Sequence, residues 1–354
     1  MIFEKTGHGG DVYGRTVRLD FSANVNPLGT PDSVRQAAAE SLARIHQYPD
    51  PCCRRLVAAI AEREGVCPQY VMCGNGAAEL IYSFCAALRL KKALIPAPAF
   101  SEYAAALKRV GCIAERYLLK QQDGFALTDA FLPVLRNGRW DAVFLCNPNN
   151  PTGRLIPPVL LEEICRICGE KGIRLFVDEC FLDLSDDGGT HGMKEHLRRY
   201  PGLFILKAFT KNYGMAGLRL GYCLCADREL LERMSKTTQV WNVSTPAQEA
   251  GLAALQETAF LAEARAIIRT EREFLFRALE KLGFWVCPTE ANYVLFHSTQ
   301  PLEETLLAQG ILIRSCTNYP GLGEGWYRIA VKRRADNLQL IDALEQMMGG
   351  SDAE

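Results

Sequence analysis

The sequence predicts an α/β fold in which a large domain, built on a mostly parallel seven-stranded sheet flanked by helices, precedes a smaller α+β domain. Seven short apolar runs lie between about Tyr70 and Cys225, and segments with helical periodicity separate them. This alternation is typical of a parallel sheet with helices on both faces. Such sheets bind ligands at the carboxyl ends of their strands.

The elements follow one another along the chain. The strand-like runs of the large domain are YVMCG, KALIPAP, CIAERYLL, AVFLCNP, IRLFVDE, LFILKAF and LGYCLCA. Helical spacing of apolar residues marks the segments between them, for example AAELIYSFCAALRL and PPVLLEEICRICGEK. After WNVSTPAQEA, interleaved apolar and charged residues predict an amphipathic helical stretch that continues to about Leu282. The smaller unit then contains the strand-like runs ANYVLFHS, ILIRSC and WYRIAV and the helix NLQLIDALEQMM.

We therefore expect three parts in the chain. Residues 1–40 are too few to fold alone and form an N-terminal arm that packs with the small domain and the ligand site. Residues 41–245 form the large, ligand-binding domain, and residues 246–354 form the small α+β domain.

The composition favours a small-molecule partner. The 354 residues include 40 basic and 41 acidic side chains, so no net field attracts nucleic acid or an anionic membrane. With no apolar run of signal-peptide or membrane-spanning length, we expect a soluble, cytoplasmic protein. The 14 cysteines are scattered through apolar runs, which is typical of a reducing compartment. The one CxxC pair, Cys165 and Cys168, lacks a second ligand pair at zinc spacing, so we expect helix packing there and no metal site.

Polar side chains follow three consecutive strand-like runs. CNPNNPTG brings Asn150 to the end of one strand, FVDE brings Asp178 to the end of the next, and ILKAFTKNYGMAGLRLGY carries Lys211 and Arg219 after a third. These four side chains should converge at one edge of the sheet. An amide, a carboxylate, an amine and a guanidinium together can hold an aromatic aldehyde phosphate.

With these motifs in this order, the sequence resembles the fold type I pyridoxal-phosphate enzymes, the aspartate aminotransferase superfamily, over nearly its whole length. The resemblance implies that Lys211, which follows Thr210 and precedes Arg219 by eight positions, bonds the cofactor aldehyde. It also implies that Asp178 keeps the pyridine nitrogen protonated, that Asn150 donates to the phenolic oxygen, and that Arg219 pairs with the phosphate.

The resemblance assigns further residues to the cofactor. Backbone amides in the turn CGNGAAEL, at Gly76, Ala77 and Ala78, would receive the phosphate at a helix start. Phe100 matches the aromatic residue that stacks on the ring, and Tyr48 matches a tyrosine that reaches the phosphate of the neighbouring subunit in a homodimer. Ala208 departs from the usual serine or threonine, and Lys207 beside it is expected to compensate for the missing donor.

Within the superfamily, the chain is most similar to the group of histidinol-phosphate aminotransferases and threonine-phosphate decarboxylases. The stretches HGGD, DFSANVNPLG and ILIRSCTNYPGLG resemble the decarboxylases, as does Phe181, where the aminotransferases have tyrosine. Arg328 matches the arginine that binds the substrate α-carboxylate. A second anion site for a substrate phosphate would then be formed by an N-terminal lid and its surroundings: His8, Gly9, Gly10, Asn24, Arg314 and Asn318.

The resemblance implies a pyridoxal 5'-phosphate-dependent carboxy-lyase that converts O-phospho-L-threonine to 1-aminopropan-2-yl phosphate for the nucleotide loop of cobalamin. A histidinol-phosphate aminotransferase remains an alternative. A decarboxylase of O-phospho-L-serine is another, because this substrate differs from O-phospho-L-threonine by one methyl group, which is worth only about 1 to 3 kcal/mol in a pocket. A cofactor-sensing domain of a transcription regulator would need a DNA-binding module ahead of the fold, and we see none before about Asp20.

Overall fold

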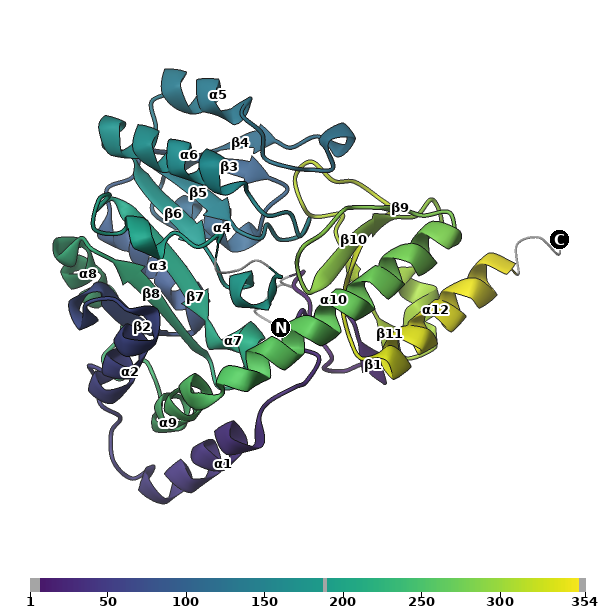
Figure 1. Ribbon diagram of the computed structural model, residues 1–354, viewed down its shortest axis with the longest axis horizontal. Helices are drawn as coiled ribbons and strands as arrows, with labels where there is room; N and C mark the ends of the chain where they lie inside the picture. Colours follow the sequence, from purple (N-terminus) through teal and green to yellow (C-terminus); the bar gives the residue numbers. More distant parts are fainter. Residues whose placement is uncertain (1–6, 187–189, 350–354) are drawn as a thin grey trace.

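The computed structural model describes residues 7–186 and 190–349, and its dominant feature is a seven-stranded sheet (Figure 1). The strands are β2 (Val71–Asn75), β3 (Lys92–Ala97), β4 (Ile113–Leu118), β5 (Ala142–Cys146), β6 (Arg174–Asp178), β7 (Leu203–Ala208) and β8 (Leu220–Cys225). They lie in the order β2-β8-β7-β6-β5-β3-β4, and only β8 runs antiparallel to its neighbours. Each of the seven apolar runs forms a strand, which confirms the predicted mostly parallel sheet.

Helices cover both faces of this sheet. One face carries α2 (Arg54–Glu64), α5 (Phe131–Asn137), α6 (Pro158–Lys171) and α9 (Thr245–Gln256), and the other carries α3 (Gly76–Ala87), α4 (Ser101–Arg109) and α8 (Arg228–Ser235). Because side chains alternate along a strand, β5 sends Val143 and Leu145 to the first face and Phe144 to the second. Cys165 and Cys168 of α6 lie in the first core, where burial raises the pKa of both thiols.

A smaller unit follows the large sheet. Its antiparallel sheet has the order β12-β13-β10-β9, with β9 (Trp285–Val286), β10 (Tyr293–His297), β12 (Arg314–Ser315) and β13 (Trp326–Ala330). A separate apolar core joins this sheet to α10 (Thr258–Lys281), α11 (Glu303–Ala308) and α12 (Arg334–Gly349). No helix within the two described ranges is long and apolar enough to cross a membrane.

The N-terminal segment contacts both units. Strand β1 (Leu19–Asp20) pairs in parallel with β11 (Ile311–Leu312) of the small unit. Helix α1 (Asp32–Ser41) instead packs along α9 beside the large sheet (Figure 1). Short 3-10 helices complete the chain at Leu42–Arg44, Pro68–Tyr70, Gln121–Asp123, Leu182–Leu184 and Lys194–His196.

The helical stretch expected to run to about Leu282 is broken at Glu257, whose ψ of 64° is not helical. Ser244 caps the first part by accepting a hydrogen bond from the amide of Ala247. The break leaves α9 against α1, α2 and β8, while α10 continues to the small sheet.

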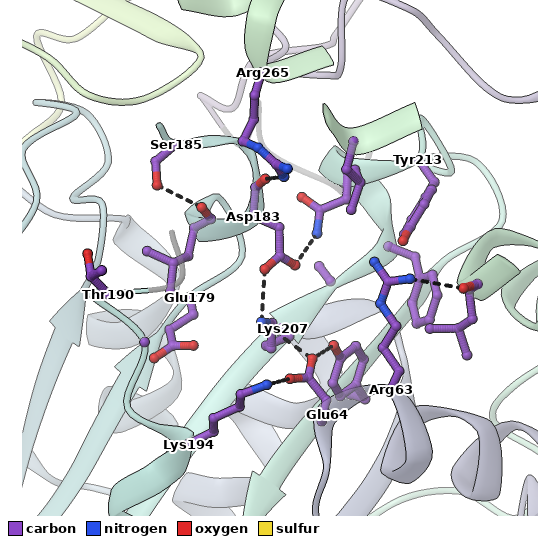
Figure 2. Close-up of a pocket in the computed structure, with 18 of the residues that line it drawn as sticks. Arg63, Glu64, Glu179, Asp183, Ser185, Thr190, Lys194, Lys207, Tyr213 and Arg265 are labelled. Carbon is purple, nitrogen blue, oxygen red and sulfur yellow. Dashed lines mark hydrogen bonds and ion pairs between the residues drawn. The ribbon is translucent and has the colours of Figure 1, made fainter. Parts of the chain in front are cut away.

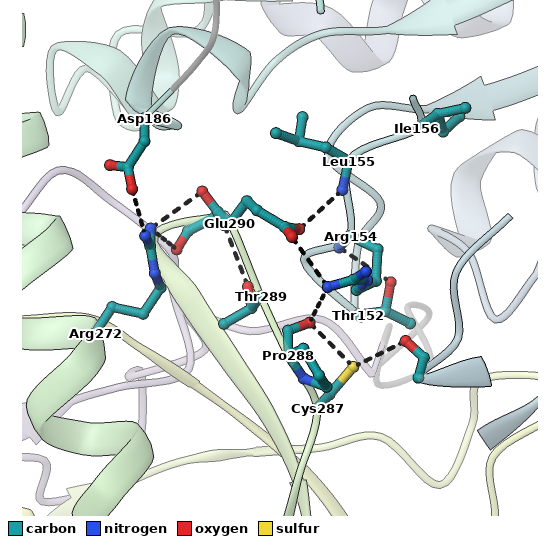
Figure 3. A network of polar contacts seen from close by, with 12 residues as sticks. Thr152, Arg154, Leu155, Ile156, Asp186, Arg272, Cys287, Pro288, Thr289 and Glu290 are labelled. Carbon is teal, nitrogen blue, oxygen red and sulfur yellow. Dashed lines mark hydrogen bonds and ion pairs between the residues drawn. The ribbon is translucent and has the colours of Figure 1, made fainter. Parts of the chain in front are cut away.

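A polar network fastens the two units together beside the NPTG turn (Figure 3). The two oxygens of Glu290 accept hydrogen bonds from Arg154 at 3.0 Å and from the amide of Leu155 at 3.1 Å. Gly153 has a φ of 75°, and a Cβ there would lie 1.8 Å from Thr289 Oγ1, so only glycine allows this approach. The turn that carries Asn150 is therefore held against the small unit.

Candidate active site

A cavity of about 410 Å³ lies where β5, β6 and β7 end, and the N-terminal segment and the small unit complete its wall. Asn150 follows β5, Asp178 ends β6, and Lys211 lies on α7 (Phe209–Asn212), directly after β7. The residues predicted for the site that line this cavity are His8, Gly9, Asn24, Ala77, Ala78, Phe100, Asn150, Asp178, Thr210, Lys211, Arg219, Arg314 and Arg328.

Asp178 lies buried at the floor of the cavity. Its Oδ1 accepts the amide of Cys180 at 2.9 Å, and its Oδ2 accepts the hydroxyl of Tyr103 at 2.6 Å. Burial raises the pKa of this carboxyl, while the hydrogen bonds from Cys180 and Tyr103 and the charge of Lys211 oppose that rise. A carboxylate held this firmly in a low-dielectric site suits a single cationic N–H partner.

Lys211 has the character of a nucleophile. Burial, together with the charges of Arg328 and Arg219, lowers the pKa of its ammonium to about 8. Near neutral pH, a substantial fraction of the molecules then carries Lys211 as a neutral amine, which is the form that attacks an aldehyde.

Lys207 precedes Lys211 by only four positions, but it lies in a different environment (Figure 2). Its Nζ is 3.0 Å from Asp183 Oδ1 and 3.4 Å from Glu64 Oε1, in a second cavity of about 560 Å³. Successive residues of a strand face opposite sides, so Ala208 lines the first cavity and Lys207 does not. The expectation that Lys207 compensates for the donor missing at Ala208 is therefore wrong.

One end of the first cavity is built for an anion. Ala77 and Ala78 lie in the first turn of α3, where backbone N–H groups are free for a ligand, and Arg219 lies beside them. Gly76 itself does not line the cavity, but a Cβ there would lie 2.4 Å from Arg219 Nη2. Arg219 has a φ of 58°, a left-handed conformation that is uncommon for non-glycine residues and is enriched at functional sites.

Two arginines occupy the opposite wall. Arg314 on β12 and Arg328 on β13 are directly opposite each other in the antiparallel pair, so both side chains lie on one face of the small sheet. Buried Arg328 donates to Asn150 Oδ1 and, at 2.8 Å, to the carbonyl of Ser22. Arg314 donates to Asn318 Oδ1 at 2.8 Å, and within residues 7–186 and 190–349 neither arginine pairs with a carboxylate. Like charges placed opposite are destabilising by themselves, which favours anionic groups of a ligand beside them.

The N-terminal segment closes one side of the cavity. A Cβ at Gly9 would lie 2.1 Å from the carbonyl oxygen of Ser22, so glycine permits the close approach. Gly10 donates its amide to the Ser22 hydroxyl at 2.7 Å, and Asn318 reaches the carbonyl of Gly7 at 3.4 Å. Asn24 lines the cavity with 2% of its surface exposed, and neither atom of its amide has a partner among the described residues. A buried amide without partners is costly, which favours a polar ligand group there.

Tyr48 is not part of this cavity. Its side chain is 77% exposed and stacks on Trp241, with 4.2 Å between ring centroids. Its predicted place is the site of a neighbouring subunit, and that stays a prediction.

Asn318 and Gly10 support the cavity wall without lining it.

Sequence reasoning missed several residues of the site. Tyr103 and Glu102 lie in the first turn of α4, just after Phe100, and both line the cavity. Tyr319 lines it from TNYPG, and the carbonyl of Ser22 positions Arg328. The spacing of Tyr103 three positions after Phe100, which is one helical turn, was the one signal available.

Comparisons with known proteins agree with this geometry. Residues 16–344 match the family described as aminotransferase class I and II. The threonine-phosphate decarboxylase of Salmonella typhimurium is 38% identical over 94% of this chain and 92% of its own length. The structure of the histidinol-phosphate aminotransferase from Clostridium acetobutylicum superposes with a TM-score of 0.87 at 29% identity, over 94% of this chain and 99% of that one.

The L-threonine-O-3-phosphate decarboxylase from Porphyromonas gingivalis superposes with a TM-score of 0.82 at 25% identity, again over 94% of this chain and 99% of the other. The large mixed sheet, the small antiparallel sheet and the cavity between them are those of fold type I. The chain therefore belongs to the class I and II aminotransferase family of pyridoxal-phosphate-dependent enzymes.

Proposed function

We propose that this protein is a pyridoxal 5'-phosphate-dependent carboxy-lyase that converts O-phospho-L-threonine to 1-aminopropan-2-yl phosphate, a building block of the cobalamin nucleotide loop. The placement of Arg314 directly opposite Arg328 carries the proposal. Together with Arg219, which lies beside the first turn of α3, and apart from Lys211, the cavity offers three separate guanidinium groups. One suits the cofactor phosphate, and two remain for a substrate with both a carboxylate and a phosphate.

The residues present fit the cofactor. Arg219, Thr210 and the amides of Ala77 and Ala78 would hold its phosphate, and Phe100 would contact the ring face. The firmly held carboxylate of Asp178 would pair with the ring nitrogen. When bound, pyridoxal 5'-phosphate supplies an aldehyde for an amine and a ring that accepts the electron pair of the broken bond.

The protein side chains then decide which bond at Cα breaks. Arg328, oriented by Asn150 and Ser22, would hold the α-carboxylate, while Arg314 and His8 would hold the phosphate. Fixing the two ends of the substrate fixes its rotation about Cα. In decarboxylation the C–C bond to the carboxylate breaks, CO₂ leaves and a proton is added at Cα. In transamination Lys211 instead removes the Cα proton.

Phe181 favours decarboxylation over the rival aminotransferase reaction on histidinol phosphate. It lines the cavity 5.7 Å from Lys211 Nζ, measured to the ring centroid, and provides no hydroxyl where the aminotransferases are expected to have one. The similarity to the Salmonella typhimurium enzyme supports the same reading. O-phospho-L-serine is the alternative substrate for decarboxylation.

The direct test is to incubate the enzyme and cofactor with O-phospho-L-threonine or O-phospho-L-serine and measure CO₂. A parallel assay supplies histidinol phosphate with 2-oxoglutarate. We expect CO₂ release with phosphothreonine and little oxoglutarate-dependent turnover. Turnover that needs 2-oxoglutarate and releases no CO₂ would establish the aminotransferase instead.

We also propose a cytoplasmic homodimer with shared active sites. Other exposed apolar side chains lie near the exposed Tyr48–Trp241 pair in the sequence: Leu42 and Ile45 precede Tyr48, and Val240 precedes Trp241. Apolar patches of this kind mark association surfaces. The cysteines are free in the structure, which suits a reducing compartment.

Mixing two inactive variants tests the shared site. If Tyr48 of one subunit serves the other subunit's cofactor, Lys211→Ala and Tyr48→Ala each lower activity, and hybrids of the two regain one native site. Sedimentation measures the oligomeric state in parallel. A fully active monomer rules out the shared site.

A further inference from the structure

His8 makes a contact that its predicted role as a phosphate ligand does not require. Its Nε2 lies 3.0 Å from Oε1 of Glu102 on α4. The other oxygen of Glu102 accepts the hydroxyl of Tyr82, on the neighbouring helix α3, at 2.6 Å. Glu102 itself lines the cavity.

The charge on Glu102 determines which nitrogen of His8 carries hydrogen here. The hydrogen bond to His8, followed by the one from Tyr82 and by the charges of His8 and Arg109, lowers the pKa of this carboxyl even though burial opposes the shift. Glu102 is therefore an ionised acceptor, and Nε2 of His8 must be the donor. Within the described parts of the chain Nδ1 has no hydrogen-bond partner, so it is the ring atom left for a ligand.

The Glu102 carboxylate would weaken the binding of a phosphorylated substrate if it faced the cavity without His8. A phosphomonoester carries nearly two negative charges at neutral pH, and a carboxylate in the same cavity repels it. With His8 between them, the carboxylate instead accepts from Nε2, and in the doubly protonated form of the ring Nδ1–H can donate to phosphate. A carboxylate that accepts from one imidazole nitrogen fixes the orientation of the ring and so the direction in which the other nitrogen points.

We propose that Glu102, braced by Tyr82, is a positioning residue that holds His8 over the cavity through Nε2 and so leaves Nδ1 to contact the phosphate of the substrate. The inference rests on the proposed phosphorylated substrate. Glu102 also anchors the N-terminal segment between its contacts at Gly7 and Gly10.

The test is a double-mutant cycle on the cofactor-loaded enzyme, with isopropyl phosphate as the probe. This phosphomonoester has no amine and no carboxylate, so its dissociation constant, measured by calorimetry, does not depend on which reaction the enzyme catalyses. We expect His8→Ala to weaken its binding about tenfold to a hundredfold. Glu102→Gln should weaken it about threefold to tenfold, and Tyr82→Phe should weaken it less.

The decisive measurement is Glu102→Gln in the His8→Ala background. Without His8 the carboxylate can only repel phosphate, so its removal should leave the affinity unchanged or improve it. Equal weakening in both backgrounds would mean a merely structural role, and tighter binding in both would show that Glu102 opposes the phosphate. Either result overturns the inference. Glu115 on β4, a partly exposed carboxylate paired with Lys92 of β3, provides the matched control, and Glu115→Gln should change nothing.

Failure of the proposed function has a different signature. If isopropyl phosphate binds and responds to the cycle but no CO₂ is released, the positioning role stands and the reaction assignment falls. If CO₂ is released from phosphothreonine and Glu102→Gln has no effect on either KM or probe binding, the positioning role falls alone.

Discussion

The two cavities at the end of β7 both contain several charged side chains. In one cavity these charges are paired with one another, and in the other they are left unpaired. In the cavity of Figure 2, Lys207 is paired with Asp183 and Glu64, and Lys194 and Tyr222 complete the hydrogen bonds of Glu64. In the cavity of the candidate active site, Lys211, Arg219, Arg314 and Arg328 have no carboxylate within ion-pair distance among the residues described.

The pKa values of the two lysines follow this difference. Burial would lower the pKa of Lys207, but Asp183, Glu64 and Glu179 outweigh it and raise the pKa above its ordinary value. Lys211 lies partly exposed in its cavity with arginines for neighbours, and burial together with their charges lowers its pKa to about 8. Paired buried charge holds the fold together, whereas unpaired buried charge is tolerated where a ligand or a reaction needs it.

The largest effect expected from this comparison is on catalysis. Lys211→Ala should lower decarboxylation roughly a thousandfold or more, because no other lysine among the described residues lines the cavity. The visible absorbance band of the lysine-bound cofactor should vanish as well, as a spectrophotometer would show. A variant that keeps this band would place the reactive amine elsewhere, with Lys207 the first suspect.

The paired lysine should instead affect stability. Lys207→Met leaves Glu64 and Asp183 without their buried partner and should lower the free energy of unfolding by about 3 to 5 kcal/mol, measured with urea. The folded fraction should still bind the cofactor and show its visible band. Lys194→Met is the matched control, since the Lys194 side chain is 38% exposed and its ion pair with the same Glu64 is worth less than about 1 kcal/mol. Similar losses for both lysines would remove the distinction between the two cavities.

The unpaired arginines should affect substrate selection. Arg314→Ala removes one charge-assisted contact, worth about 1.5 to 3 kcal/mol, so kcat/KM for O-phospho-L-threonine should fall about ten- to a hundredfold. The low turnover of unphosphorylated threonine should hardly change, because it lacks the group that Arg314 holds. His8→Ala should act in the same direction, with a loss nearer the lower end of this range, since His8 lies on the N-terminal segment and Arg314 on a strand. Equal fractional losses on both substrates would indicate a role in the fold.

The smallest expected effect is a pH dependence. Attack on the cofactor aldehyde needs neutral Lys211, so the rate of cofactor capture by the cofactor-free protein should rise about tenfold between pH 7 and pH 9 and then level off. Stopped-flow absorbance measures this rate. Arg328→Gln removes a charge that lowers the pKa and should move the midpoint upward. A rate that keeps rising to pH 10 would show that Lys211 has an ordinary pKa.

Local patterns determined much of this protein. Runs of five to eight residues between helical segments specified all seven strands of the large sheet, and parallel strands necessarily bring their carboxyl ends to one edge. Asn150, Asp178 and Lys211 could therefore be placed together from their positions after three strands. The sequence also predicted the turn at Gly76 and the helix that follows it, because backbone geometry depends on near neighbours.

Contacts between distant parts of the chain were decided only by the tertiary structure. Glu102 and His8 are 94 positions apart, and Arg328 and Asn150 are 178 apart, so no local pattern reports either contact. The break at Glu257 and the ion pairs of Lys207 likewise depend on what packs against them. The sequence does not show whether a charged side chain is paired in the fold or left for a ligand. That outcome depends on the electrostatic environment, which is built by residues from other elements.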